Sequence, residues 1–205
     1  MEAWQTRGRA GAPTRKREDV RAGPGAECGM SIREALPGDA AALASVHVLS
    51  WRAAYRDLLP GPYLAALDVE ERAAAWRARL TAPDRPTVLL ATEPGRDGDG
   101  RPVAFSCFRP WPGEGFAPAP TAELAALYAL PEVWGAGVGR ALLSATTGAL
   151  VAAGFRSAAL WVFAGNERAR RFYGAAGWRA DGATVREETG GRVLEELRYR
   201  KDLLD

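Results

Sequence analysis

The sequence predicts an α/β protein in which strands and helices are interleaved along one chain. Three observations support this class. Stretches with apolar residues at helical spacing alternate with short apolar runs that are rich in β-branched residues. Turns rich in glycine, proline and aspartate separate these stretches. A Gly190-Gly191 pair divides two long runs near the C-terminus, which is the pattern of a hairpin. In chain order, the predicted elements are β-α-α-β-β-β-α-β-α-β-β.

The chain of 205 residues is long enough for one full domain and too short for two ordinary ones. Residues 1–29 are rich in Gly, Pro, Ala and Arg and lack periodic apolar residues. Such a segment cannot bury enough surface to offset its ordering entropy. We therefore expect a disordered extension over residues 1–29 and a single folded domain over residues 30–205.

Composition excludes several classes of partner. No apolar run approaches the length needed to span a bilayer, and no apolar segment follows the basic N-terminal residues, so neither a membrane span nor a secretory signal is expected. Nothing in a formal net charge of +2 argues for a nucleic-acid partner, although the mildly basic residues 1–29 leave a nucleic-acid-binding arm as a weaker alternative. Cys28 and Cys107 lie far apart and are expected to be reduced thiols in the cytoplasm. The lone His47 cannot complete a metal cluster, so no metal site is expected.

The first half of the chain is predicted to form a strand followed by two helices. Asp39 stands where a helix would begin, and Asp68 with Glu71 has the spacing of a capping box. The Leu-Leu-Pro-Gly-Pro segment at 58–62 is expected to end the first helix. The elements predicted here are a strand over 32–35 and helices with apolar faces over 43–55 and 69–80.

The second half alternates strands and helices and ends in a hairpin. A loop at 93–102 joins two hairpin arms, and the Pro-rich segment at 110–120 is expected to be irregular. Asn166 is expected to cap the last helix, which Gly177 ends. The elements predicted here are strands over 87–92, 103–109, 122–130, 157–163, 182–190 and 192–202, and helices over about 139–153 and 166–177.

The segment PEVWGAGVGRALL, residues 131–143, places three alternating glycines before a helix. The first amides of a helix have no partner within the helix and carry partial positive charge, and glycines let a ligand approach them closely. The segment therefore predicts an anion cradle, with phosphate as the expected guest. The predicted amides are those of Gly135, Ala136, Gly137, Val138, Gly139 and Arg140, and the Arg140 side chain would add a full charge.

Two nucleotide-binding motifs do not fit this segment. A P-loop needs Gly-Lys-Ser/Thr, whereas Arg140 and Ala141 follow the last glycine here. A dinucleotide fingerprint needs a glycine where Leu142 stands and an acidic residue at the end of the next strand, where the chain has Trp-Val-Phe at 161–163. A tight strand-to-helix turn without a ligand stays open as the alternative.

Three segments resemble the GNAT superfamily of N-acetyltransferases. WGAGVGRALL resembles the loop with which the family binds the acetyl-CoA diphosphate, although Trp134 stands where the pattern has Gln or Arg. GNERARRFYGAAGW, residues 165–178, is similar to the Asn-x-x-Ala-x-x-Phe-Tyr signature, and ELAALYALP, residues 123–131, to the strand before the loop. The resemblance covers about residues 30–203. It implies the GNAT fold: a central, mixed, mostly antiparallel sheet that is flanked by helices, with splayed central strands.

The resemblance implies acetyl-CoA as acetyl donor and no metal. In the family, two central strands part, and the pantetheine arm fills the gap and bonds to the first of them. Here that strand would offer the backbone groups of Leu127, Tyr128 and Ala129, since splayed strands expose groups that need partners. An N–H of this strand would stabilise the tetrahedral oxyanion. Asn166 would contact the coenzyme arm, although helix capping alone also explains it.

The resemblance also implies the acid and base of acetyl transfer. Tyr173 matches the family's tyrosine acid; the alternative is a core tyrosine. Glu123 lies four residues before Leu127 on the same strand, where some members carry a glutamate base, and because a strand alternates faces the two are expected to share a side. Water relays are the alternative to Glu123. His47 is expected to be a buried structural residue, and a covalent route through Cys107 is disfavoured because it lies on the wrong strand.

The acceptor implied by the resemblance is a primary amine of a small molecule or peptide. Its pocket would involve the first helices and the last hairpin. The reaction would be direct transfer in a ternary complex; a non-catalytic acyl-CoA sensor is the alternative, and a homodimer is left open. Candidates for the pocket wall are Trp51, Tyr55, Tyr63 and Trp111, and candidates for holding a cationic amine are Glu187, Glu188, Glu195 and Glu196.

Overall fold

The computed structural model describes residues 30–94, 100–112 and 120–204. The expectation of a disordered extension over residues 1–29 falls outside the described residues. Two 3₁₀ turns precede helices, η1 (Pro37–Asp39) and η2 (Pro131–Val133). The strands are β1 (Ser31–Glu34), β2 (Thr87–Thr92), β3 (Pro102–Pro110), β4 (Thr121–Ala129), β5 (Ser157–Phe163), β6 (Arg179–Thr189) and β7 (Arg192–Asp202). The helices are α1 (Ala40–Ala54), α2 (Gly61–Ala65), α3 (Val69–Thr81), α4 (Val138–Ala152) and α5 (Glu167–Ala175).

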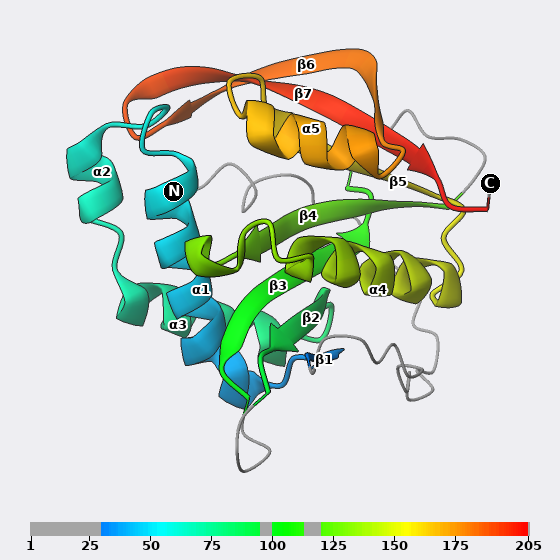
Figure 1. Cartoon of the computed structure of the whole chain (residues 1–205), viewed down its shortest axis with the longest axis horizontal. Coiled ribbons are helices and arrows are strands. Elements are labelled where there is room, and N and C mark those ends of the chain that lie inside the picture. Colours follow the sequence, from blue (N-terminus) through cyan, green and yellow to red (C-terminus); the bar gives the residue numbers. More distant parts are fainter. Residues whose placement is uncertain (1–29, 95–99, 113–119, 205) are drawn as a thin grey trace.

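These strands form one sheet in the order β1-β2-β3-β4-β5-β7-β6. Neighbouring strands run antiparallel except β4 and β5, which pair in parallel. Helices cover both faces of the sheet (Figure 1). The predicted mixed, mostly antiparallel sheet flanked by helices is therefore confirmed, and so is the predicted order of elements. The short helix α2 was missed, because its segment begins in the Pro-Gly-Pro run that was expected to be a break.

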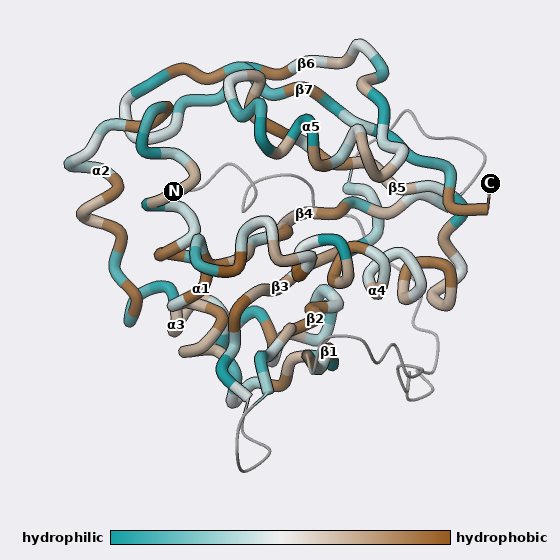
Figure 2. The backbone as a smooth tube through the Cα atoms, viewed as in Figure 1, coloured by the Kyte–Doolittle hydropathy of each residue, from teal (hydrophilic) through white to brown (hydrophobic). Residues whose placement is uncertain are grey.

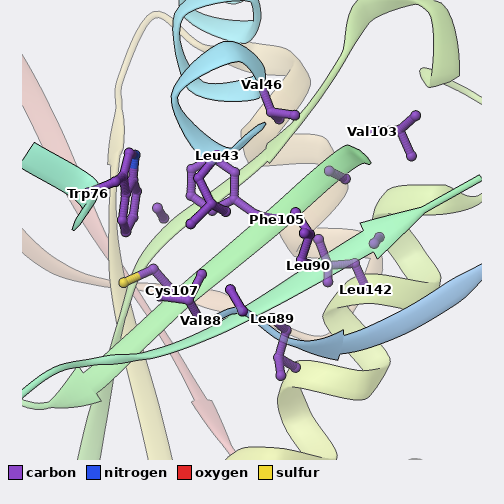
Figure 3. Packing of buried hydrophobic residues seen from close by; sticks show 14 of the residues in the cluster. Leu43, Val46, Trp76, Val88, Leu89, Leu90, Val103, Phe105, Cys107 and Leu142 are labelled. Carbon is purple, nitrogen blue, oxygen red and sulfur yellow. The ribbon is translucent and has the colours of Figure 1, made fainter. Parts of the chain in front are cut away.

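Helices α1 and α3, which cover one face of the sheet, contribute most of the helical residues of the larger hydrophobic cluster, which also includes Val138 and Leu142 of α4. Trp76 of α3 meets Phe105 of β3 edge-on, with ring centroids 5.2 Å apart. Leu43 of α1 packs beside this pair (Figure 3), and all three side chains are fully buried. Burying a side chain of this size contributes roughly 1.5–3 kcal/mol. The central strands β3 and β4 carry mostly hydrophobic residues, whereas β6 and β7 also carry many hydrophilic ones (Figure 2).

The opposite face of the sheet packs against α4 and α5. The Ser106 hydroxyl of β3 and the Thr146 hydroxyl of α4 lie 2.7 Å apart, both fully buried. Leu143 of α4, Leu160 of β5 and Trp178 belong to one buried cluster on this side. Alternate side chains of β3 therefore point to different helix layers, as a strand that is buried on both faces requires.

Helix starts follow the predicted caps only in part. The Asp68 carboxylate accepts the Glu71 amide at 2.7 Å and caps α3, and Asn166 accepts the Ala169 amide at 3.1 Å and caps α5. Asp39 stands at the start of α1 but bonds backwards, to the Leu36 amide and to Arg33. Its carboxylate therefore holds β1 to the turn before α1, and the pKa of Asp39 is lowered chiefly by its hydrogen bond to Arg33.

Strands β4 and β5 separate soon after they start. They pair over only three residues each, from Thr121 to Glu123 on β4 and from Ser157 to Ala159 on β5. Beyond these residues β4 has no ladder partner on that side, and the sheet opens between the two strands (Figure 1). The predicted splay of the central strands is confirmed.

A β-bulge shifts the faces of β4. The register pairs Cys107 with Ala126 but Phe108 with Leu124, so Ala125 is an extra residue. Cross-strand partners project to the same face, and Glu123 and Leu127 are opposite Arg109 and Ser106, which are three residues apart. Glu123 and Leu127 therefore face opposite sides of the sheet, and the expectation that they share a face is wrong.

Candidate active site

The glycine-rich segment forms the turn that leads from η2 into α4. Gly135 and Gly137 have φ angles of +82° and +86°, a region that side-chain-bearing residues rarely adopt. Gly137 is the residue that caps α4, and a Cβ built on either glycine would meet nothing within 4 Å. The turn therefore needs glycine for its backbone angles, and the space beside it is open to a ligand.

Gly139 differs from Gly135 and Gly137 because its φ angle is not positive and its surroundings are packed. It lies in the first turn of α4, where a Cβ would contact the Phe172 ring of α5 at 3.5–3.6 Å. This is ordinary van der Waals contact, so the residue marks the point where α4 and α5 approach each other. Val138 is buried, and Arg140 is exposed at the start of the helix.

A cavity of about 470 Å³ occupies the opening between β4 and β5. It is lined from four directions: by α1, by β4 with the glycine turn, by β5 with α5, and by the end of β6 and the middle of β7 in the last hairpin. The lining includes Ser50, Trp51, Tyr55, Glu123, Leu127, Tyr128, Ala129, Trp134, Gly135, Gly137, Gly139, Arg140, Trp161, Asn166, Arg168, Tyr173, Thr189 and Glu196. Most of the predicted site residues thus meet at one place, although they come from distant parts of the chain. Ala136 in the glycine turn and Val138 at the start of α4 are not part of the lining.

One end of the cavity is basic. The glycine turn, Arg140 and Arg168 of α5 line it, and the Arg168 guanidinium lies 3.8 Å from the centre of the Trp134 ring. Partial burial lowers the pKa of Arg168 from its usual value. Cations and backbone amides at a helix start together favour an anionic guest such as a phosphate.

The free edge of β4 lies along the cavity. Leu130 donates its amide to the Val103 carbonyl at 2.8 Å, and hydrogen-bonded pairs alternate along an antiparallel ladder. Tyr128 therefore bonds toward β3, while the backbone groups of Leu127 and Ala129 point toward the opening. The expectation that Tyr128 offers its backbone here does not hold; its ring lines the cavity instead.

The Ala129 carbonyl is already engaged. It accepts the Ser50 hydroxyl at 3.0 Å and the Trp134 indole N–H at 2.8 Å. Both lone pairs of this oxygen are thereby used. The groups of β4 that face the opening are then the Ala129 amide and both backbone groups of Leu127, which suits an extended guest that carries amides.

Tyr173 lies on α5 at the point where the cavity passes between the strands. Its ring packs against Phe172 and Trp178, and only 8% of the residue is exposed. Burial, with a smaller contribution from Tyr55, raises the pKa of Tyr173 well above its usual value of 10. The phenol is therefore fully protonated near neutral pH and able to donate a proton into the cavity.

Glu123 is a buried carboxylate rather than a surface charge. Only 3% of it is exposed, and its Oε2 accepts the Arg109 guanidinium N–H at 2.7 Å. This bond uses one of the two carboxylate oxygens, and the side chain still lines the cavity. Arg109 thus fixes the carboxylate at the end of the cavity away from the glycine turn.

The end of the cavity beneath α1 is aromatic and acidic. Trp51, Tyr55 and Trp161 line it, and Tyr55, which hydrogen-bonds to Tyr128, has its pKa raised to about 12, mainly by burial. Among the four predicted glutamates only Glu196 lines the cavity, and it is 8% exposed. The other three, Glu187, Glu188 and Glu195, lie elsewhere on the hairpin.

Two predicted wall residues are not part of the lining. The Tyr63 ring packs under the hairpin turn, so close that a Cβ on Gly190 would lie 2.6 Å from it. Trp111 lies behind Trp161, with ring centroids 6.3 Å apart. Both aromatic residues therefore support the wall of the cavity from outside.

His47 and Cys107 are buried away from the chemistry, as expected. His47 stacks on Tyr128 at 5.0 Å, and burial, helped by Arg72 and Arg79, lowers its pKa well below 6.5. Burial also raises the pKa of the Cys107 thiol to about 12, so it is neither ionised nor accessible. Neither group is suited to proton transfer or to covalent catalysis at neutral pH.

The described residues contain neither a candidate metal site nor a candidate membrane-spanning helix. In residues 30–94, 100–112 and 120–204 there is no group of three or more His, Cys, Asp or Glu side chains placed to hold a metal ion. Within the same ranges no helix has both the length and the apolar character needed to cross a membrane.

Sequence reasoning missed Arg168, Ser50 and the double use of the Ala129 carbonyl. Arg168 stands at one of the unspecified positions between Asn166 and Ala169 in the Asn-x-x-Ala signature, so no pattern marked it. It is noticed only through its contact with Trp134 in the folded chain.

Known proteins share this architecture and parts of this sequence. The model of the acetyltransferase (GNAT) family matches residues 49–178. The uncharacterized N-acetyltransferase YuaI of Bacillus subtilis (strain 168) is 33% identical over 139 residues, which are 67% of this chain and 73% of YuaI.

Solved structures agree with these matches. The ribosomal-protein-alanine N-acetyltransferase from Brucella melitensis has a TM-score of 0.62 at 25% identity and covers 84% of this chain and 99% of its own. The YncA acetyltransferase of Salmonella typhimurium, solved with its cofactor acetyl-CoA, has a TM-score of 0.61 at 22% identity and covers 86% and 95%. At 22% identity, the similarity to the Salmonella typhimurium structure shows a shared fold alone.

Proposed function

The chain belongs to the GNAT acetyltransferase family and is an N-acetyltransferase, and we propose that it transfers acetyl directly from acetyl-CoA to a primary amine within a ternary complex. The acceptor is a small molecule or a peptide. The diphosphate of the coenzyme lies on the amides of residues 135–140, and its amide-bearing arm follows the free edge of β4.

The observation that carries this proposal is the continuous cavity between β4 and β5. Its two ends differ in charge: the glycine turn, Arg140 and Arg168 form a basic end, and Glu123 and Glu196 form an acidic end. An anionic donor and a cationic amine would enter such a cavity from opposite ends. Both could then be bound at once, which is what direct transfer requires.

The coenzyme, when bound, supplies an activated acetyl thioester; the chain's own groups supply the positioning and the protons. The Ala129 and Leu127 amides lie on the open edge of β4 and can donate to an oxyanion, which stabilises charge that develops in the transition state. A C–N bond forms as the C–S bond breaks, and the departing thiolate takes a proton.

Tyr173 is the proposed donor of that proton. A phenol with a raised pKa is a weak acid in water, but desolvation raises the pKa of a thiol for the same reason. Burial acts in the same direction on the Cys107 thiol, whose pKa it raises to about 12. Desolvation of a thiolate in the cavity therefore favours its protonation, which offsets part of the cost of removing the phenol proton.

Glu123 is the proposed acceptor of the proton that the amine loses, with a chain of water molecules as the alternative. Its carboxylate is held by Arg109 at the acidic end, on the α1 side of the sheet. The bulge at Ala125 turns the Glu123 side chain to the α1 face of β4, whereas the coenzyme arm follows the free edge of that strand. An amine that approaches from the α1 side can therefore meet Glu123 without displacing the arm.

Initial-rate kinetics test the proposal. Thiol release from acetyl-CoA is followed with a panel of amines that includes monoamines, polyamines and peptides. Direct transfer predicts that thiol release depends on the amine and that double-reciprocal plots of the initial rate intersect when both substrates are varied. Parallel lines in these plots would contradict direct transfer. If folded protein that binds the coenzyme released thiol with none of the amines, the proposed acceptor class would be wrong.

A further inference from the structure

Trp134 stands where the loop pattern of the family has Gln or Arg, so the chain lacks a polar side chain at that position. The indole is instead half-buried against β4 and donates its N–H to the Ala129 carbonyl at 2.8 Å. This bond fixes the ring at the wall of the cavity, with one face turned to α5. The substitution therefore creates a flat aromatic surface beside the glycine turn.

Arg168 covers that surface. Its guanidinium carbon lies 3.8 Å from the centre of the Trp134 ring, well inside the range of about 6 Å within which a cation is attracted to an aromatic face. A guanidinium that lies near a ring can keep its N–H groups available at its edge, where they donate to a phosphate in a forked arrangement. Both residues line the cavity at its basic end.

The other two arginines of α5 are engaged elsewhere. Arg170 donates to the Ala164 carbonyl at 3.0 Å, and Arg171 pairs with Glu167 at 3.0 Å on the outer surface. Within the described residues, no ion pair or hydrogen bond of the Arg168 guanidinium is found. Its contact with Trp134 is thus the interaction that orients it toward the cavity.

We infer that Arg168 is a diphosphate-binding residue and that Trp134 positions it, so that the pair replaces the polar side chain that the loop lacks. The charge reaches the phosphates from α5 rather than from the loop itself. This inference rests on the proposed function, because it assumes that the coenzyme diphosphate lies on residues 135–140.

Calorimetric titration of CoA and of dephospho-CoA into Arg168→Ala tests the inference. One lost charge-assisted contact predicts about tenfold weaker binding of both ligands, since both carry the diphosphate. Arg171→Ala, three residues along the same helix, is the matched control and is expected to bind as the parent does. A loss with CoA that is absent with dephospho-CoA would assign Arg168 to the 3′-phosphate and overturn the inference.

The role of Trp134 is tested by replacing it with Phe, which keeps an aromatic face, and with Leu, which does not; both remove the bond to Ala129. Arg168→Ala is expected to weaken CoA binding in the Phe background but to change it less than twofold in the Leu background. Equal losses in both backgrounds would overturn the positioning role of Trp134.

The failure of this inference is distinct from the failure of the proposed function. If the parent protein binds CoA and Arg168→Ala binds it equally well, only the inference is wrong. If the folded parent protein does not bind CoA at all, the proposed function is wrong. Thermal unfolding of each variant confirms that a loss of affinity is not a loss of folded protein.

Discussion

Replacement of Gly137 by Ala probes the turn on which the account depends. Gly137 caps α4 with φ +86° and ψ −12°, where an L-residue is strained by about 1–2 kcal/mol. A Cβ at this position would meet nothing within 4 Å, so the expected loss of stability is backbone strain without a clash.

Gly148→Ala is the matched control for this change. Gly148 lies inside α4, is exposed, has ordinary helical angles, and also has open space around a built Cβ. Alanine is more favourable than glycine in a helix interior by about 0.5–1 kcal/mol. The same substitution on the same helix is therefore expected to change stability in opposite directions at the two positions.

Thermal unfolding with and without CoA measures both effects. In a domain of this size each kcal/mol shifts the midpoint by about 2–4 °C, so Gly137→Ala is expected to unfold lower by about 2–8 °C and Gly148→Ala higher by about 1–4 °C. The added methyl group would also enter the open space beside the amides that we propose to hold the diphosphate. If CoA binding became tenfold weaker, the stabilisation that saturating CoA gives to the folded protein would fall by about 1.4 kcal/mol.

Two results would refute this reasoning. If Gly137→Ala were as stable as the parent protein, the left-handed turn would not describe the chain in solution. If the variant were destabilised but stabilised by CoA to the same extent as the parent, the amides of this turn would not hold the diphosphate.

Three further predictions concern buried groups. Tyr173→Phe is expected to lower kcat by about 10²–10⁴ with little change in the CoA dissociation constant, and a fully active variant would exclude Tyr173 as the proton donor. Iodoacetamide at about pH 8 is expected to leave Cys107 unlabelled in folded protein, as read by peptide mass spectrometry, because burial raises the thiol pKa to about 12; rapid labelling would contradict its burial. The pKa of His47 in the folded protein lies well below 6.5, so the unfolded chain binds the proton more strongly. The contribution of neutral His47 to the free energy of unfolding is therefore complete above about pH 6.5. Below that pH the free energy of unfolding is expected to fall by up to about 1.4 kcal/mol per pH unit. Urea unfolding at several pH values checks this, and His47→Asn, in a chain with a single histidine, is expected to remove the slope.

The order of elements could be predicted because each has a local cause. Helices α1 and α3 carry apolar residues at helical spacing, and Asp68 and Asn166 cap α3 and α5 with their own side chains. The Gly190-Gly191 turn fixes the last hairpin through backbone angles that glycine alone adopts readily. These signals depend on residues that are close in sequence, so they can be recognised without knowledge of the fold.

The faces of β4 could not be predicted, because they depend on pairing with another strand. The bulge at Ala125 is a property of the register between β3 and β4, and nothing local marks it. It reverses the relation of Glu123 to Leu127, so strand alternation alone gave the wrong face. The same limit applies to the backbone of Tyr128, whose direction follows from its pairing with Phe105.

The sequence marked the glycine turn most clearly, because the turn depends on backbone angles. Gly135 and Gly137 are recognisable because their angles demand glycine, whereas the contact of Arg168 with Trp134 joins two positions 34 apart in number and needs the folded chain. Among the four predicted hairpin glutamates, strand alternation could not single out Glu196, because the lining also depends on the opening between β4 and β5.

Calorimetric titration of the folded protein with CoA tests most directly whether the glycine turn and the parted strands together hold the coenzyme. Saturable binding of one CoA per chain is expected, weakened by Gly137→Ala and unaffected by Gly148→Ala. Absence of binding to a protein that melts cooperatively, even at millimolar CoA, would contradict this expectation.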